Sequence, residues 1–312
     1  MIELDGLTLR YGDFVAVDNL SCRIEPGEII GLLGRNGAGK TTTMKMLTGA
    51  LEPDAGEVRV DDMAMTRHRR ALQQRIGYLP ENCPVYPEMT VVEFLDYRAG
   101  LLGVPKTERM PSIRAVIARA ELEDKLLAPI NTLSRGYRQR VGVAQAIVHK
   151  PDIVILDEPT NGLDPQQIGH MRELIRELAH HATVIVSTHI LQEVAAVCQR
   201  VLILRHGELV IDTALASLKQ NRQLLVGTDA DEQRLRALLA GIDGITAIRR
   251  SRDHDTLYAL DLDAPADAIA PQVARLLVEN GQQLFTLQTH GEDLETLFHD
   301  VNVAAAAEVA HA

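Results

Sequence analysis

The chain has 312 residues, which is long enough for a large hydrophobic core and favours two domains. Apolar residues make up 46% of it and charged residues 24%, a balance that is ordinary for a soluble globular protein. The formal net charge of −11 argues against broad attraction to nucleic acid or to an anionic membrane surface, although it leaves room for a local basic patch.

The first residues give no sign of a targeting signal. Met1 to Asp5 include acidic side chains where a signal peptide would carry a basic segment. No run of about 18 apolar residues occurs anywhere, so no membrane span is predicted. The cysteines, Cys22, Cys83 and Cys198, are scattered without metal-site spacing, which favours a reducing compartment. We therefore expect a cytoplasmic protein whose membrane role, if it has one, depends on a partner.

Two strands joined by a turn are predicted at residues 2–10 and 15–24, because apolar residues alternate loosely along both. The turn is expected at Tyr11, Gly12 and Asp13. Aromatic residues make up only 3% of the chain and tryptophan is absent, so Tyr11 is conspicuous. An aromatic side chain at a strand end can stack on a nucleotide base, or it can pack at the edge of a sheet. The local sequence leaves both interpretations open.

A phosphate-binding loop follows the apolar run from Glu28 to Leu33. Its sequence matches the P-loop pattern of a glycine, four free positions and then Gly-Lys-Ser/Thr. The glycines permit a tight turn whose N–H groups face phosphate oxygens, and the helix expected from Lys40 to Thr48 directs the positive end of its dipole to the same point. Lys40 would contact the β- and γ-phosphates, and the Thr41 hydroxyl would contact Mg²⁺. The residues expected to bind the nucleotide here are Gly34, Arg35, Asn36, Gly37, Ala38, Gly39, Lys40, Thr41 and Thr42.

Short strands at residues 57–60 and 76–79 precede a helical insert at about residues 90–150. A proline-marked loop that contains Glu81 follows the second strand. Thr90 and Glu93 form a capping box that begins the first helix of the insert. The helical pattern then continues to Ala128, and breaks are predicted at Pro105 and Pro111.

Another helix is predicted to begin at Ser134, which is well placed as its N-cap. Gly136 leaves room for a close backbone approach. A helix start of this kind can bind an anion, but caps are common, so the local sequence favours a purely structural role.

Residues 153–156 form a short apolar run, as expected of a parallel strand that is buried on both faces. The run leads to Asp157 and Glu158 at its carboxyl end, where open α/β sheets bind their ligands. One carboxylate can hold Mg²⁺ through its water shell, and the other can orient or deprotonate an attacking water. Since a P-loop lies upstream, we predict that both are functional rather than solvated turn residues.

A helix begins at Asp164 and Pro165, and the local sequence makes Asp164 a plain helix cap. The next buried strand, predicted at residues 183–187, ends on Thr188 and His189. A histidine at the carboxyl end of another core strand favours a functional role, because such strand ends meet at one edge of the sheet.

From Asn221 the pattern changes to a compact β-α-β-β-α-β order, which is that of a ferredoxin-like domain. The chain is thus predicted to be an α/β P-loop NTPase domain at residues 1–219 with a small ferredoxin-like α+β domain at residues 220–302. The first domain combines a parallel core sheet, antiparallel N-terminal strands and the helical insert. The alanine-rich residues 303–312 are predicted to be a disordered tail. The predicted elements of the second domain are strands at 223–227, 245–250, 255–262 and 283–288 and helices at 231–240 and 266–279.

Residues 1–219 resemble the ATP-binding subunit of an ABC transporter, and the resemblance is specific because several motifs occur together. Residues 34–41 resemble the Walker A motif, 153–158 the Walker B motif with its following glutamate, 161–164 the D-loop and 133–137 the signature. His189 is similar to the switch histidine, and Tyr11 matches the base-stacking aromatic. The resemblance implies catalytic roles for Glu158 and His189, magnesium contacts for Thr41, Glu81 and Asp157, nucleotide contacts for Tyr11, Ser134 and Gly136, and dimer communication for Asp164.

Three positions depart from the family pattern. The signature has Arg135 and Tyr137 where glycine and glutamine are usual, and Glu81 replaces the glutamine of the Q-loop. Glu81 can still ligand Mg²⁺ through an oxygen, but it adds charge and cannot donate a hydrogen bond when it is ionised. These variants resemble bacterial exporters related to gliding-motility, sodium-efflux and drug-efflux ABC systems, which also carry a small C-terminal domain.

In that family two nucleotide-binding domains enclose two ATP molecules, and each P-loop faces the signature helix of its partner. The resemblance therefore implies an ATPase with ATP and Mg²⁺ as ligands, which converts ATP and water to ADP and phosphate. It also implies a homodimer, or a dimer with a related subunit, that acts on an integral membrane permease at the inner face of the membrane, and it favours export.

Two other functions compete with transport. A soluble ABC ATPase of DNA repair, chromosome structure or translation is disfavoured, because about 90 residues separate Thr41 from Leu133 without a long coiled coil and the chain has one P-loop. A module that binds ATP without hydrolysing it is opposed by the presence of both Glu158 and His189. No nucleic-acid partner is expected.

Overall fold

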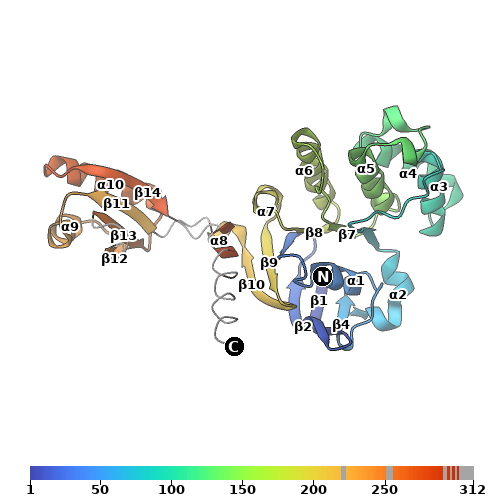
Figure 1. The fold of residues 1–312 in the computed structure, drawn as a ribbon, viewed down its shortest axis with the longest axis horizontal. Helices are drawn as coiled ribbons and strands as arrows, with labels where there is room; N and C mark the ends of the chain where they lie inside the picture. The colour runs from blue at the N-terminus through green and yellow to red at the C-terminus, as the bar shows by residue number, and fades with distance from the viewer. Residues whose placement is uncertain (219–222, 251–255, 291–293, 296, 299–300, 302–312) are drawn as a thin grey trace. The chain divides into compact units, whose positions relative to one another are not determined.

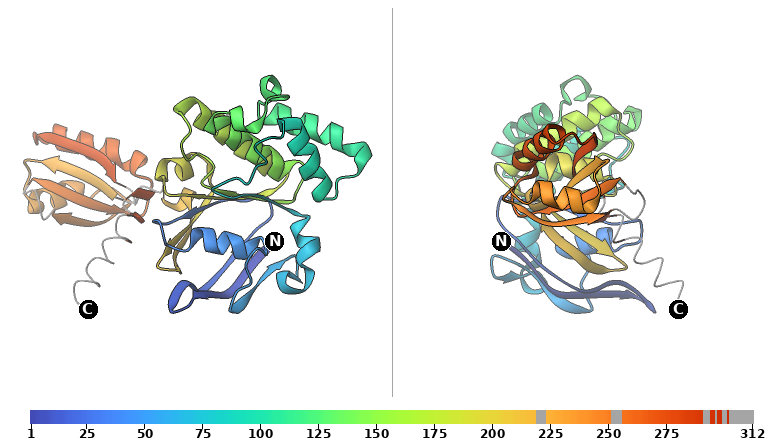
Figure 2. Two further views of the ribbon diagram at one scale, coloured as in Figure 1. Left: turned by 45° about the vertical axis from the view of Figure 1, so that its right-hand side comes forward. Right: turned by 90° about the vertical axis from the view of Figure 1, so that its left-hand side faces the viewer.

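The computed structural model describes residues 1–218, 223–250, 256–290, 294–295, 297–298 and 301. The chain divides into two compact units, Met1–Ala214 and Leu215–Ala312 (Figures 1 and 2). The predicted disordered tail at residues 303–312 lies outside the described residues, as does the predicted strand start at residue 255.

A six-stranded sheet forms the centre of the first unit, in the order β10-β9-β3-β8-β7-β6. Its neighbours pair in parallel except for β10, which runs antiparallel to β9. The parallel strands include the predicted apolar runs, and every residue of β3 and β7 is buried. The strands are β3 (Ile29–Leu33), β6 (Ile76–Leu79), β7 (Ile153–Asp157), β8 (Thr183–Thr188), β9 (Arg200–Arg205) and β10 (Glu208–Ala214).

Both faces of this sheet are covered, which explains why β3 and β7 are buried along their whole length. Successive side chains of a strand point to opposite faces. In β7, Ile153 and Ile155 pack into a core shared with the antiparallel sheet and helix α1. Val154 and Leu156 pack into the second core, beneath α3, α4, α5 and α6. The expectation of a doubly buried parallel sheet is confirmed.

An antiparallel sheet in the order β2-β1-β4-β5 packs on one side of the central sheet. The predicted N-terminal strands are confirmed, but the turn between them is shorter than expected because Tyr11 pairs with Phe14 in register. Gly12, with φ of 60°, and Asp13 form the whole turn. The strands are β1 (Ile2–Tyr11), β2 (Phe14–Ile24), β4 (Ala55–Val60) and β5 (Met63–Ala64).

The helical insert contains α3 (Val91–Leu101), α4 (Lys106–Arg119) and α5 (Arg135–Ile147). The capping box is present, since the Thr90 hydroxyl accepts from the Glu93 N–H and the Glu93 carboxylate accepts from the Thr90 N–H. Pro105 precedes α4 as its N-cap residue.

The predicted break at Pro111 is wrong, because α4 runs through it. A proline inside a helix removes one backbone hydrogen bond. Burial of the neighbouring apolar side chains Ile113, Val116 and Ile117 in the second core supports the helix across that gap.

Other helices connect the strands of the first unit. The long α6 covers the sheet face that also carries α5, and α1 begins within the P-loop sequence (Figure 1). Their bounds are α1 (Lys40–Leu47), α2 (Met65–Gln73), α6 (Pro165–Ala179) and α7 (Leu191–Val197).

The second unit has the predicted β-α-β-β-α-β order and one antiparallel sheet, β12-β13-β11-β14. Helices α9 and α10 pack on this sheet around a core that includes Leu224, Leu260 and Val273. The elements are α8 (Leu215–Leu218), β11 (Gln223–Thr228), α9 (Glu232–Leu239), β12 (Ile245–Arg250), β13 (Leu257–Leu262), α10 (Ala266–Glu279) and β14 (Leu284–His290).

Candidate functional site

The P-loop joins β3 to α1 and curls around the Lys40 side chain. Gly39 has φ of 103°, and a Cβ atom there would lie 2.7 Å from the Ala16 carbonyl oxygen, so only glycine fits. The Lys40 ammonium donates to the Gly34 carbonyl at 2.7 Å. Burial lowers the pKa of Lys40, whereas the nearby carboxylates Glu158, Asp157 and Glu81 oppose that shift. The buried Lys40 ammonium, whose side chain is bonded to a backbone carbonyl, is well suited to bind phosphate oxygens.

Asp157 ends β7 and is held by the neighbouring strand. The Ser187 hydroxyl in β8 donates to Oδ1 of Asp157 at 2.5 Å. The other oxygen, Oδ2, is buried and has no hydrogen-bond partner among the described residues. A buried carboxylate oxygen without a partner is costly, so the position suits a cation.

The residues around Asp157 suit Mg²⁺ rather than a closed metal site. No group of three or more His, Cys, Asp or Glu residues that could hold a metal occurs in the part of the chain that the structure describes. Mg²⁺ usually takes one or two carboxylates, several waters and phosphate oxygens from the substrate. Asp157, the Thr41 hydroxyl and the Glu81 carboxylate are the groups that would contribute.

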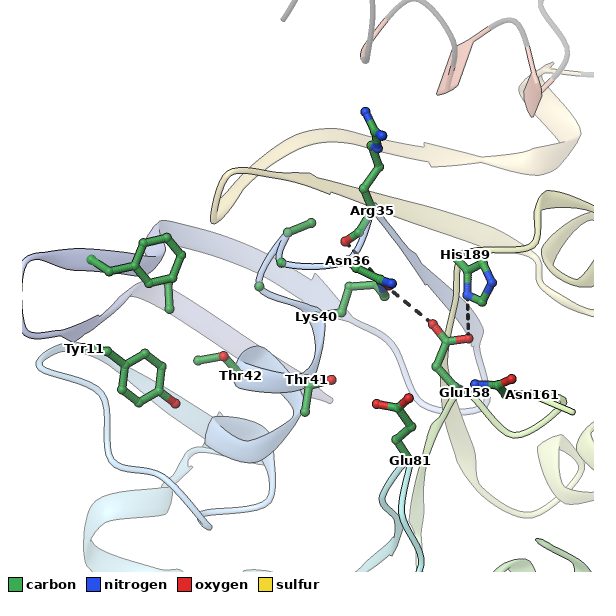
Figure 3. Close-up of a pocket in the computed structure, with 15 residues that line it drawn as sticks. Tyr11, Arg35, Asn36, Lys40, Thr41, Thr42, Glu81, Glu158, Asn161 and His189 are labelled. Carbon is green, nitrogen blue, oxygen red and sulfur yellow. Dashed lines mark hydrogen bonds and ion pairs between the residues drawn. The ribbon is translucent and has the colours of Figure 1, made fainter. Parts of the chain in front are cut away.

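Glu158 lies between Lys40 and His189 (Figure 3). Its Oε1 is 3.8 Å from the Lys40 ammonium, and its Oε2 is 3.0 Å from Nδ1 of His189. The residue is buried and its backbone has φ of 50°, a left-handed conformation that costs of order 1 to 3 kcal/mol for a side-chain-bearing residue. The Glu158 N–H donates to the Ser187 hydroxyl at 3.0 Å, which helps to hold this conformation.

These groups surround a cavity of about 340 Å³. Figure 3 shows Lys40 and Thr41 on one wall, Glu158, Asn161 and His189 on another, and Glu81 between them. Of the sequence-predicted residues, the cavity is lined by Tyr11, Arg35, Asn36, Gly37, Ala38, Gly39, Lys40, Thr41, Thr42, Glu81, Glu158 and His189.

Three lining residues were not predicted as nucleotide contacts, namely Phe14, Ala16 and Asn161. Phe14 could have been predicted from the sequence, because aromatic residues are scarce in this chain and Phe14 lies across a two-residue turn from Tyr11. Both rings are exposed, Tyr11 at 53% and Phe14 at 61%, so neither is a buried packing residue. Asn161 begins the predicted D-loop, but nothing in the sequence placed its side chain in the cavity.

Ser134, Gly136 and Asp164 do not line the cavity of their own chain. Ser134 caps α5 by accepting from the Tyr137 N–H at 3.4 Å, and Asp164 caps α6 by accepting from the Gln167 N–H at 2.9 Å. Within one chain their observed roles are therefore structural, as the local sequence suggested. Gly34 and Asp157 are not among the lining residues, but the Gly34 carbonyl accepts from Lys40 and the Asp157 carboxylate accepts from Ser187.

A P-loop after β3 of a parallel sheet, with a buried lysine and two carboxylates at the carboxyl end of β7, defines a P-loop nucleoside triphosphatase. Comparisons with known proteins narrow this class. Residues 17–161 match the family described as ABC transporter.

Two curated relatives and one solved structure illustrate the match. An uncharacterized ABC transporter ATP-binding protein of Bacillus subtilis is 35% identical over 83% of this chain and 86% of its own. The Nod factor export ATP-binding protein I of Paraburkholderia xenovorans is 37% identical over 70% of this chain and 72% of its own. A dimeric ATP-binding cassette, solved in a post-hydrolysis state with ADP and phosphate, superposes with a TM-score of 0.63 at 26% identity, over 69% of this chain and 99% of the other.

The chain therefore belongs to the family of ABC transporter ATP-binding proteins. It is an ATPase that binds ATP with Mg²⁺ and supplies a transporter with energy. The comparisons support this function over a role in DNA repair, chromosome structure or translation. Subunits of this family dimerise and work with membrane permease components. In the described part of this chain, no helix is both long and apolar enough to cross a bilayer.

Proposed function

We propose that two copies of this chain close over two ATP molecules and drive export through a separate integral membrane permease, at the cytoplasmic face of the membrane. The observation that carries the proposal is Glu158, a buried carboxylate held between Lys40 and His189 at the wall of the phosphate cavity. The Nod factor export relative supports export as the direction.

Each group of the cavity has a proposed task in hydrolysis. Lys40 and the P-loop N–H groups hold the β- and γ-phosphates. Thr41, Asp157 and Glu81 would hold Mg²⁺, which would supply positive charge at the phosphate oxygens. Glu158 accepts the hydrogen of the attacking water, since its Oε1 faces the phosphate side near Lys40. His189 holds the other oxygen of Glu158 and so fixes the direction of the carboxylate.

The dimer is proposed because one chain supplies only part of the expected ATP contacts. Ser134 and Gly136 lie at the start of α5, outside the cavity of their own chain. A second copy would bring the same helix start to this cavity, and the N-terminal end of a helix attracts phosphate. The similar solved cassette is dimeric, which supports this arrangement.

Glu158→Gln tests the mechanism, because it keeps the shape of the side chain and removes the base. We expect ATP hydrolysis to fall by roughly 10²-fold or more while ATP still binds. Unhydrolysed ATP should then hold two copies together, so light scattering should report a dimer with ATP and a monomer with ADP or without nucleotide. Glu193→Gln is the matched control, since Glu193 is equally buried but pairs with Arg172 outside the cavity.

The catalytic role of Glu158 and the ATP-dependent dimer are contradicted by different results. Normal hydrolysis by Glu158→Gln would remove Glu158 from the mechanism. An inactive variant that stays monomeric with ATP would leave the catalytic role intact and contradict the dimer.

The loop after β6 connects the cavity to an exposed aromatic surface, which we define as Tyr86, Tyr97 and Leu101. Glu81 lines the cavity, and Tyr86 follows five residues later, with its ring 5.3 Å from that of Tyr97. Leu101 is 60% exposed and lies one helical turn beyond Tyr97 on α3. Exposed apolar patches of this kind commonly bind partners, so we propose that the permease contacts this surface.

Tyr97→Ala tests the permease contact. Co-purification of the permease with the chain from membranes should fall, whereas ATP hydrolysis by the isolated chain should not change, because Tyr97 lies outside the cavity. Leu127→Ala, at a residue that is 74% exposed and is not part of the surface defined above, is the control. Equal recovery of the permease with both variants would place the contact on another surface.

A further inference from the structure

The side chains of the two unusual signature residues, Arg135 and Tyr137, contact different parts of the chain. The Tyr137 hydroxyl donates to the Asp124 carboxylate at 3.1 Å, and the Lys125 ammonium lies 5.2 Å from its ring centre. Tyr137 is therefore held within the helical insert. Arg135, two residues earlier, extends instead to the loop between β7 and α6.

The Arg135 guanidinium rests directly on Gly162. A Cβ atom at Gly162 would lie 2.6 Å from Cζ and 2.7 Å from Nε of Arg135, so a side chain there would displace the guanidinium. Gly162 also has φ of 75°, which favours glycine independently. The flat guanidinium thus packs against bare backbone, a contact that a flexible ammonium would not reproduce.

A second contact of the same kind runs in the opposite direction. A Cβ atom at Gly136 would lie 2.4 Å from Oε1 of Gln167. Gln167 belongs to the first turn of α6, where its Oε1 accepts from the Asp164 N–H. Each segment therefore places a side chain on a glycine of the other. We call these two contacts, Arg135 on Gly162 and Gln167 on Gly136, the glycine interlock.

The interlock holds the loop that carries the proposed base. The Asn161 N–H donates to the Glu158 carbonyl at 3.1 Å, and the Leu163 N–H donates to the Thr160 carbonyl at 3.2 Å. These successive turns connect Gly162 to Glu158 through only three intervening residues. Asn161, between them, lines the ATP cavity. A shift of Gly162 therefore moves groups on the cavity wall.

We propose that Arg135 is a positioning residue that locks the start of α5 to the loop from Glu158 to Asp164, so that movement of the helical insert is transmitted to the hydrolytic carboxylate. This inference rests on the role of Glu158 proposed above. With glycine at position 135, as is usual in the family, half of the interlock would be absent. The unusual arginine therefore makes the insert and the loop move as one body in this chain.

Arg135→Ala tests the lock by removing the side chain that covers Gly162. ATP affinity of the single chain should change by less than about twofold, because Arg135 does not line the cavity of its own chain, whereas kcat should fall roughly tenfold, because a small displacement of a catalytic group is costly. Amide hydrogen exchange should accelerate at residues 159–163. Arg135→Lys should not restore the kcat, because an ammonium does not reproduce the flat contact on Gly162.

Arg138→Ala is the matched control, since it removes an exposed arginine from the same helix without touching the loop. It should leave both kcat and loop exchange at the wild-type values. Gly162→Ala disturbs the same contact from the loop, because the added Cβ displaces the Arg135 guanidinium. It should lower kcat and accelerate amide hydrogen exchange at residues 159–163, as Arg135→Ala does. This variant provides the test if Arg135→Ala fails to fold.

Three results would overturn the inference. These are wild-type kcat and loop exchange in Arg135→Ala, equal losses in Arg135→Ala and Arg138→Ala, and a loss confined to ATP affinity. None of these results changes the interpretation of Glu158→Gln. Normal ATP hydrolysis by that variant would contradict the role of Glu158 as the base.

Discussion

The two units of the chain both cover a sheet with helices, but they place polar side chains differently. In the first unit β7 is buried along its whole length and becomes polar only at its last residue, Asp157. In the second unit β13 alternates between buried and half-buried residues, and Asp261 lies within the strand. The first pattern concentrates chemistry at one edge of a parallel sheet, whereas the second spreads polar groups over a sheet face.

This difference indicates which polar residues of a sequence can be recognised as functional. A strand buried on both faces tolerates few polar residues, so a carboxylate at its carboxyl end indicates a functional site. In an antiparallel sheet with helices on one face, alternate residues are polar for solubility alone. Among the described residues of the second unit we find no counterpart of the Lys40, Asp157 and Glu158 arrangement.

Lys40→Ala tests the first half of the comparison and should have the largest effect. The variant removes the buried cation that faces the phosphates, so ATP affinity measured by calorimetry should fall by about 10²-fold, as expected for a charge-assisted contact of roughly 3 kcal/mol. Lys45→Ala, on the exposed side of the same helix, is the control and should bind ATP normally. Unchanged affinity in Lys40→Ala would show that the strand edge is not the nucleotide site.

Tyr11→Ala should have a smaller effect, because the ring is half exposed at the mouth of the cavity. Stacking has little base preference, so ATP and GTP should both bind about fivefold more weakly, a loss of about 1 kcal/mol. Phe14→Ala is the informative comparison, since Phe14 pairs with Tyr11 across the turn and also lines the cavity. An effect in Phe14→Ala alone would assign the stacking role to the phenylalanine.

Much of the catalytic unit could be predicted, because its signals are local. The P-loop, the buried strand before Asp157 and the strand before His189 are each readable from a few consecutive residues, and the structure brings Lys40, Glu158 and His189 to one cavity. Strands β9 and β10 were not predicted, although residues 201–204 form an apolar run, and β10 is a half-exposed edge strand with a weak signal.

The remaining features depend on tertiary contacts that no local pattern encodes. The glycine interlock joins α5 to a loop more than twenty residues later in the sequence, and only packing makes Arg135 meet Gly162. The unpartnered oxygen of Asp157 likewise follows from the position of Ser187 on the neighbouring strand. Pro111 shows the converse, since burial in the second core overrides a local signal that predicts a helix break.

A chain that ends at Ser217 tests the second half of the comparison and should have the smallest effect. The cores of the first unit contain only residues before Ala214, and the core of the second unit begins at Leu224, so each unit buries its own apolar side chains. The shortened chain should remain folded by circular dichroism and should bind ATP within about twofold of the full chain, because distant sites contribute nearly independently. Lys40→Ala in the shortened chain should again abolish most binding. Unfolding of the shortened chain would show that the two units stabilise each other, and the contrast between a catalytic sheet and a separate accessory sheet would then be wrong.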